Sequence, residues 1–463
     1  MASFEKLVPQ LEEALKEMPL LDAHTHMDAK HLAARGLDDV ALYHMVISDL
    51  YSAGYPDGSR MDEWPDEKER VRRIEMAIPY YGAIQNCGVA WGLRIILKDL
   101  YGWKEPITAD NWKKLDAKIR EKTNDPAWPR QVLDRVKIRR TCTETWRGHD
   151  GSADDVFQYS LEWCFFARCQ WGEFDAVLYD LENSWQFDKP QPPLPVTTGG
   201  KRPRVPREIR SADDADAALD HYFACIPFDK ILSTAQHIST DINYIDNVTR
   251  DQFNKALSNR KNAGPAEQDV YSSYLFEGFL NRMESLPRKV MFQFSFAAEP
   301  LPFESGSRIR QDTLSSLAKI IARHPRQNFQ CFLASMHANQ TIATFCRELP
   351  NLSVAGYWWH NFFPSFIPRV MSERLDMIST NKFVGFFSDA YTSEWAYAKA
   401  VMVRKCLARV LAEKIATGQY DKSLALDVAK RILWETPQTL LGMVPKAEPK
   451  KGAKSVKGKA SRK

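Results

Sequence analysis

Two histidines separated by a single residue carry the strongest chemical signal in the sequence. His24 and His26 stand near the end of a short apolar, β-leaning run that begins at Leu20. Because side chains at i and i+2 of a strand point to the same side, the two imidazoles are expected to project together. Imidazole nitrogens bind divalent transition metals. The spacing indicates a metal site, although two polar residues that begin a loop would give the same pattern.

An anionic residue is needed beside such a pair, to balance the charge of the metal. Asp389 ends the last β-leaning run, which begins at Phe383. In a closed barrel the last strand adjoins the first, so this carboxylate would meet His24 and His26. A carboxylate there could also take a proton from water or from a substrate hydroxyl. The alternative is that Asp389 caps the helix that follows.

Strand-like and helix-like segments alternate over more than 300 residues. Helical patterns cover Gln311–Arg323, Gln340–Arg347 and Glu394–Ile415. Seven runs are predicted as strands, and an eighth is expected: Leu20–His24, Ile138–Thr143, Lys230–Thr234, Lys289–Phe296, Phe329–Ala334, Leu352–Tyr357 and Phe383–Ser388. This alternation predicts an α/β fold, a (β/α)8 TIM-type barrel. The glycine-rich motifs that bind dinucleotides or nucleoside triphosphates are absent from the sequence.

Three segments depart from a minimal barrel, which is expected to cover residues 1–444. Residues from about 61 to 135 are charged and helical in pattern, and they predict an insertion after the first strand. Residues 184–208 hold six prolines and two glycines, which predicts a long loop. Residues 445–463 contain eight Lys/Arg and one Glu with almost no bulky apolar residue, so they are predicted to be a disordered basic tail.

The composition excludes several classes of protein. The formal charge of +4 comes from the basic tail, because the remainder has 55 basic and 58 acidic residues. The body is therefore slightly acidic, which argues against a specific nucleic-acid partner. No apolar stretch is long enough to cross a membrane, and the N-terminus lacks the pattern of a signal peptide. The eight cysteines form no Cys-x-x-Cys pair. We expect a cytoplasmic protein with buried thiols.

Taken together, these motifs resemble the uronate isomerase (glucuronate isomerase) branch of the amidohydrolase superfamily. The resemblance covers most of residues 3–443 and rests on LDAHTHMDAKHLAARGLDDV, DLYSAG, LKDLYGW, GYWWHN and KFVGFFSDAYTS. It implies a (β/α)8 barrel with one divalent metal, commonly zinc or manganese. It also implies aldose–ketose isomerisation of a sugar acid, D-glucuronate or D-galacturonate, through a cis-enediol.

The resemblance also assigns roles to residues. By position, His24, His26 and Asp389 would bind the metal, and Asp389 could double as a base. Tyr51 and His237 would be catalytic residues that carry protons. Trp359 ends a predicted strand and could stack on a sugar face.

The chain departs from the family at four of the positions that match its site. Tyr391 stands where the family has an arginine, and Ser295 replaces the histidine of the fifth strand. Gln236 and Leu50 replace an aspartate and a second histidine. The candidates for binding the substrate are Tyr391, Trp359, His337, His360 and Arg147.

These departures leave three functions open. The first is an isomerase of a small sugar acid, in a protein that could form a homo-oligomer. The second is a hydrolase or lyase on the same scaffold, which would use metal-bound hydroxide. The third is a barrel that has lost catalysis and serves in binding or assembly.

Overall fold

The computed structural model describes most of the chain. The described residues are 4–28, 31–58, 66–143, 155–161, 181–182, 185, 207–226, 228, 231–238, 243–296, 311–357 and 363–443. The predicted basic tail (445–463) lies outside this part, as does the predicted Pro-rich loop (184–208) apart from a few residues. Within these ranges, no helix has the length and apolar composition to span a membrane.

Eight parallel strands form one sheet, and their order in the sheet is their order in the chain. The strands are β1 (Leu20–Thr25), β2 (Ile138–Thr143), β3 (Phe157–Leu161), β4 (Ile231–Ile238), β5 (Met291–Phe296), β6 (Phe329–Leu333), β7 (Leu352–Ala355) and β8 (Phe383–Val384). Each of the seven predicted runs contains or overlaps one strand, and β3 is the strand that was not located from the sequence. The α/β fold with a parallel sheet is therefore confirmed.

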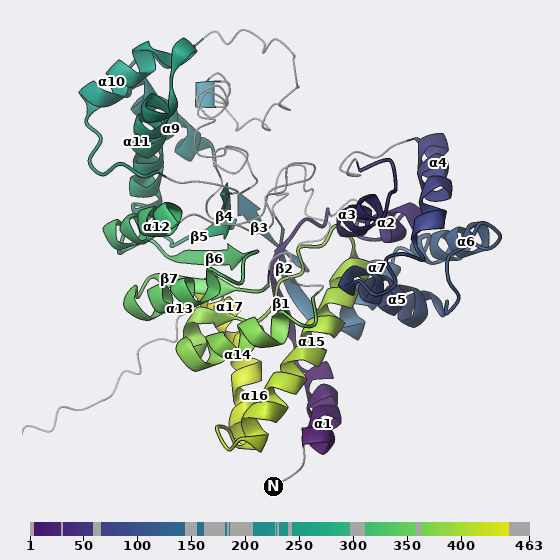
Figure 1. Cartoon of the computed structure of the whole chain (residues 1–463). Coiled ribbons are helices and arrows are strands. Elements are labelled where there is room, and N and C mark those ends of the chain that lie inside the picture. Colours follow the sequence, from purple (N-terminus) through teal and green to yellow (C-terminus); the bar gives the residue numbers. More distant parts are fainter. Residues whose placement is uncertain are drawn as a thin grey trace, which may run out of the picture.

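The helices follow the strands as expected for parallel pairs. They are α1 (Phe4–Lys16), α2 (Leu37–Ala41), α3 (His44–Ser52), α4 (Glu67–Ala77), α5 (Gly88–Tyr101), α6 (Trp112–Thr123), α7 (Trp128–Arg135), α9 (Ala212–Cys225), α10 (Arg250–Ser258), α11 (Pro265–Glu284), α12 (Gln311–Arg323), α13 (Asn339–Glu348), α14 (Ile367–Met377), α15 (Ser393–Ala416), α16 (Lys422–Lys430) and α17 (Thr436–Leu440). Figure 1 shows α2 to α7 gathered on one side of the sheet, and α9, α10 and α11 together on the other.

The segment after β8 returns to β1. The backbone N–H of Asp389 donates to the carbonyl oxygen of His24 at 3.0 Å, and that of His26 donates to the carbonyl oxygen of Ala390 at 2.9 Å. β8 itself has only two residues, so it ends earlier than the sequence predicts. The first strand and the residues that follow the last one are nevertheless joined through their backbones.

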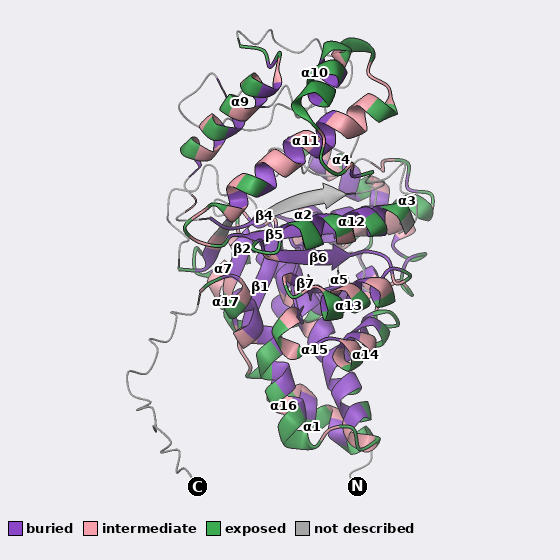
Figure 2. Cartoon of the chain, turned by 90° about the vertical axis from the view of Figure 1, so that its left-hand side faces the viewer, coloured by how far each residue is buried: buried purple, intermediate pink, exposed green. Residues whose placement is uncertain are grey.

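The two faces of the sheet bury different clusters. One face packs against the helices, while the other carries a smaller apolar cluster that includes Leu21, Met291, Phe332 and Phe387. The strands are buried almost throughout, and the helices expose only their outward sides (Figure 2). Because the smaller cluster contains residues from strands as far apart as β1 and β6, it holds those strands in place relative to one another.

Gly356, which follows β7, is required by two separate constraints. Its φ of +49° lies in the left-handed region. A Cβ added there would lie 2.1 Å from Cδ1 of Phe387, a buried side chain of the smaller cluster. Phe387 in turn packs on Phe332, with ring centroids 4.6 Å apart. The close approach of backbone and ring therefore allows only glycine.

Gly356→Ala is expected to destabilise the protein by about 2–5 kcal/mol, from the left-handed backbone and the overpacked ring together. Urea denaturation followed by fluorescence measures the change in free energy of unfolding. Gly82→Ala is the matched control, since a Cβ at Gly82 would meet nothing within 4 Å. An equal effect of both substitutions would contradict the assignment of the Phe387 contact.

Candidate functional site

Three of the predicted site residues meet at the end of β1. Nε2 of His24 and Nε2 of His26 lie 3.3 and 3.1 Å from Oδ1 of Asp389. The side chain of His24 is 4% exposed, that of His26 19% and that of Asp389 7%. One ligand atom from each residue lies within 4.8 Å of the others. We refer to these three residues as the His-His-Asp cluster.

The backbone of Asp389 is held in an unusual conformation. Its φ is +51°, which is uncommon for a residue with a side chain. Two buried groups donate hydrogen bonds to its carbonyl oxygen, the hydroxyl of Tyr43 at 2.8 Å and Nζ of Lys399 at 2.9 Å. Nζ of Lys399 also donates to the Tyr43 hydroxyl at 2.9 Å. These bonds fix the carbonyl and so help to direct the carboxylate toward the two imidazoles.

Burial and neighbouring groups shift the pKa values of Asp389 and of Lys399 beside it. Burial alone would raise the pKa of Asp389, but hydrogen bonds to His24 and His26 and the charge of Lys399 hold it well below its usual range. Burial lowers the pKa of Lys399 to about 8, against the opposing effect of nearby carboxylates. Asp389 is therefore an anion at neutral pH.

A second acidic residue lies beneath the cluster. Asp22 is fully buried, and its Oδ1 accepts hydrogen bonds from the backbone N–H of Ser388 at 2.7 Å and from that of His24 at 3.4 Å. Burial raises its pKa to about 6, while these bonds oppose the shift. Asp22 thus ties β1 to the residue that precedes Asp389.

The cluster fits a divalent metal ion. Neighbouring ligand atoms in a tetrahedral or octahedral zinc shell lie about 3–3.5 Å apart, given bonds of about 2.1 Å. The separations of 3.1 and 3.3 Å between imidazole nitrogens and the carboxylate oxygen match this range. Two imidazoles and one carboxylate are also a donor set that zinc, manganese and iron accept. His24, His26 and Asp389 can therefore act together as ligands.

Aromatic rings enclose the cluster on two sides. The ring of His24 lies against Phe332 and Phe387, with centroid distances of 4.9 and 5.4 Å. On the other side Tyr391, 39% exposed, stacks on His26 at 4.9 Å and meets the edge of His44 at 5.2 Å. The apolar side excludes water beneath the histidines. The Tyr391 side offers a ring face and a hydroxyl where an arginine would offer a fixed charge.

Other predicted site residues lie elsewhere or outside the described part of the chain. Tyr51 is 45% exposed and lies close to Gly58; none of its hydrogen bonds or ring contacts within the described residues reaches the cluster. His337 is exposed just beyond β6. His237 on β4 pairs in register with Ser295 on β5, which is buried, but the His237 side chain is not described. Outside the described residues are Arg147, Trp359 and His360.

Neither family models nor curated proteins match the sequence. Solved structures do match the fold. The uronate isomerase of Thermotoga maritima superposes with a TM-score of 0.73 at 14% identity, over 94% of this chain and 97% of the other. The glucuronate isomerase of Caulobacter crescentus gives 0.74 at 14%, over 96% and 95%. The chain has the fold of the uronate isomerases. The resemblance seen in the sequence is thereby confirmed for the fold.

A more distant match has a different description. A protein from Lactobacillus casei described as a metal-dependent hydrolase superposes with a TM-score of 0.55 at 12% identity, over 94% of this chain and 97% of the other. The uronate isomerase fold thus extends to a protein described by another reaction. The fold alone does not choose the chemistry of this chain.

Sequence reasoning missed Tyr43, His44 and Lys399. Tyr43 precedes α3 and donates to the carbonyl oxygen of Asp389. His44 is the first residue of α3, and its ring meets that of Tyr391. The family resemblance instead assigns a proton-carrying role to Tyr51, on the same helix. Lys399 had one visible signal. It is a lysine within an otherwise largely apolar stretch of α15, a pattern that indicates a buried charge with a partner.

Tyr43→Phe is expected to weaken metal binding about tenfold, because loss of a group that orients a ligand costs about 10–100-fold. Lys399 still donates to the Asp389 carbonyl in this variant, so the free energy of unfolding should fall by only about 1 kcal/mol. Competition with a chromogenic chelator measures the metal affinity. Tyr80→Phe is the control, because no hydrogen bond of the Tyr80 hydroxyl is found among the described residues. Equal affinities in both variants would contradict the orienting role of Tyr43.

Proposed function

We propose that the protein is a metal-dependent aldose–ketose isomerase that acts on a sugar acid or a related polyhydroxylated carbonyl compound. The observation that carries the proposal is the buried His-His-Asp cluster, placed at the carboxyl end of β1 in a uronate isomerase fold. We also propose that the eight strands close into a (β/α)8 barrel, since active sites of such barrels lie at this end. The backbone bonds from Asp389 to His24 and from His26 to Ala390 support closure.

We propose zinc or manganese as the cofactor, held by His24, His26 and Asp389. When bound, the ion would polarise oxygen atoms of the substrate and ease the loss of a proton. Side chains around the metal ligands would exclude water and contact the substrate. Phe332 and Phe387 exclude water from the inner side of His24. Tyr391, stacked on His26, presents a partly exposed ring on which a sugar face can pack.

The reaction moves one proton between two carbons of the open-chain sugar. A base removes the proton from C2 while the C1 carbonyl oxygen takes up a proton, which gives a cis-enediol. The C2 hydroxyl then loses its proton and becomes the carbonyl, as C1 receives a proton. Asp389 is a candidate for proton transfer from a substrate hydroxyl because its low pKa keeps it ionised at neutral pH. Tyr51 and His237 remain proposals for the carbon-bound proton.

The test is a panel of aldehyde and keto sugar acids, incubated with the metal-loaded protein in deuterium oxide. Proton NMR should show interconversion of one pair, with deuterium at C1 of the ketose. The His26→Ala protein should show neither. Interconversion without deuterium would favour direct hydride transfer, and no interconversion of any pair would contradict the isomerase proposal.

The second candidate is a hydrolase or lyase, and Tyr391 is the observation that favours it. Tyrosine gives no fixed positive charge for a sugar carboxylate or an enediolate, whereas an arginine would. The structural match to a protein described as a metal-dependent hydrolase points the same way. Release of two fragments from a substrate in the NMR experiment would establish this reaction in place of isomerisation.

A further inference from the structure

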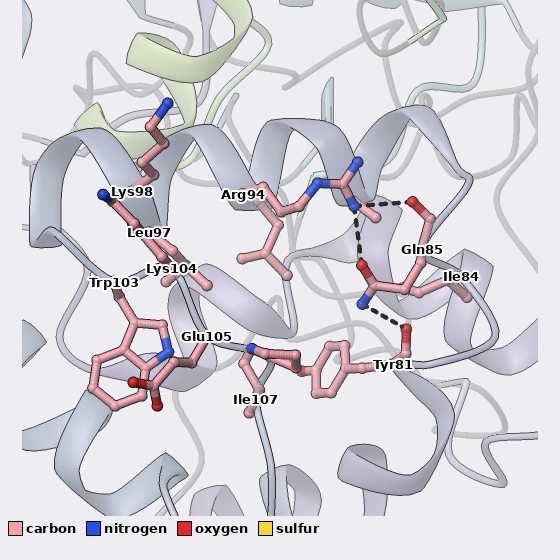
Figure 3. A pocket seen from close by; sticks show the side chains of 13 residues that line it. Tyr81, Ile84, Gln85, Arg94, Leu97, Lys98, Trp103, Lys104, Glu105 and Ile107 are labelled. Carbon is pink, nitrogen blue, oxygen red and sulfur yellow. Dashed lines mark hydrogen bonds between the residues drawn. The ribbon is translucent and has the colours of Figure 1, made fainter.

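A pocket of about 440 Å³ lies among the helices between β1 and β2, and none of its lining residues belongs to the His-His-Asp cluster. It is formed by one face of α5, by the turn that precedes this helix and by the segment that follows it (Figure 3). Pockets of this size commonly hold small organic molecules. Nothing in the proposed isomerase reaction uses it.

The floor of the pocket is apolar. Leu93 and Leu97 project from the same face of α5, one turn apart, and each is 5% exposed. Ile84 comes from the preceding turn, and Trp103 and Ile107 come from the following segment; all three are buried. Figure 3 shows the indole of Trp103 at one end of the pocket and Tyr81 toward the middle. These side chains form a surface suited to a flat apolar body.

The rim of the pocket is positively charged. Arg94 and Lys98 lie on α5 and Lys104 lies beyond it, while Glu105 is the one acidic residue of the lining. Arg94 donates to the carbonyl oxygen and to Oε1 of Gln85, both uncharged acceptors, at 2.9 and 3.1 Å. Within the described part of the chain, none of the three basic side chains forms an ion pair. Their charges can therefore act on a ligand.

The wall also contains a hydrogen-bond donor whose partner is missing from the described residues. Trp103 is 8% exposed, and its Nε1 is buried without a hydrogen-bond acceptor in this part of the chain. A buried N–H without an acceptor carries a free-energy cost of about 1–3 kcal/mol. A ligand oxygen that accepts from this N–H would remove that cost.

We propose that this pocket binds a small organic anion that has a flat apolar body and a carboxylate head. The apolar body would lie on Leu93 and Leu97, and the carboxylate would accept from Nε1 of Trp103 in the positive field of Arg94, Lys98 and Lys104. The charge of the rim selects an anion over a neutral or cationic compound of the same shape. The apolar floor separates this ligand class from the hydrophilic sugar acids proposed for the metal site.

Isothermal titration calorimetry with three compounds of one shape tests the proposal. The probes are 2-naphthoate, the neutral 2-naphthamide and the cation 2-naphthylmethylammonium. We expect one molecule of naphthoate to bind per chain, the amide to bind at least about fivefold more weakly, and the cation to give no heat of binding. Equal affinities for naphthoate and the amide would overturn the proposal, as would the absence of naphthoate binding.

Two further variants locate the binding. The double variant Arg94→Gln/Lys98→Gln should bind naphthoate about tenfold more weakly, because it loses two favourable charges. Arg409→Gln/Lys319→Gln removes the same charges from exposed positions on α15 and α12 and should bind like the parent protein. The His26→Ala protein should bind naphthoate with the same affinity as the parent protein. Loss of naphthoate binding there would place the binding at the metal site and overturn the proposal, independently of whether the isomerase function holds.

Discussion

Asp389→Asn is expected to lose nearly all bound metal and all detectable turnover. Loss of an outer group that merely orients a ligand costs about 10–100-fold in metal affinity, so loss of a ligand that also balances the charge should cost more than 100-fold. The carboxylate lies 3.1 and 3.3 Å from the two imidazole nitrogens, and the amide oxygen of asparagine in its place has no negative charge and is a weaker ligand for a divalent cation. The metal content of the purified protein, measured by plasma emission spectrometry, should fall from about one equivalent toward zero.

The control for this experiment separates ligand loss from misfolding. His221→Ala removes a histidine from α9, where its ring lies 3.6 Å from Sγ of Cys225, and should leave the metal content unchanged. Circular dichroism of the Asp389→Asn protein should match that of the parent protein prepared without metal. Retention of a full equivalent of metal by a folded Asp389→Asn protein would exclude the cluster as the metal site and, with it, the proposed function.

The sequence predicted the strands well where they form continuous apolar runs. Buried parallel strands appear as continuous apolar runs, and this held for Lys289–Phe296 and Phe329–Ala334. β3 was not located because its sequence, FQYSL, alternates apolar with polar residues and so does not form a continuous apolar run. Its Ser160 hydroxyl pairs with that of Ser233 on β4 at 2.6 Å, so β3 depends on a partner strand that its own sequence does not indicate.

The candidate site was predictable only in part. His24 and His26 could be found because side chains two residues apart on a strand point to the same side of the sheet. Asp389 followed from the expectation that the last strand adjoins the first. Lys399 and Tyr43 could not be placed, because their contact with the Asp389 carbonyl depends on how α15 and α3 pack, and the sequence gives no distance between helices. The spacing of residues on one strand and the order of the strands are thus readable from the sequence, whereas the packing of side chains from separate helices is not.

A buried carboxylate, Glu394, anchors the residues that follow Asp389. It stands in the first turn of α15, where an acidic residue would ordinarily be explained by the helix dipole. The structure shows a larger role, since the side chain is fully buried. Four groups donate to it: Tyr101 OH and Trp128 Nε1 to Oε1, and Ala34 N and Ser393 Oγ to Oε2, at 3.0–3.2 Å. Glu394 therefore joins α5, α7 and the segment after β1 to the start of α15.

Glu394→Gln is expected to destabilise the protein by about 3 kcal/mol, measured as the change in free energy of unfolding in urea. The substitution replaces one acceptor oxygen with an amide whose two N–H groups face existing donors, so at least two buried donors lose their partner. Glu413→Gln, at an exposed position on the same helix, should change stability by less than about 0.5 kcal/mol. Since the same network holds α15 close to Asp389, we also expect the Glu394→Gln protein to bind metal more weakly than the Glu413→Gln protein. Equal stability of the two variants would mean that the four bonds to Glu394 do not anchor this end of the sheet.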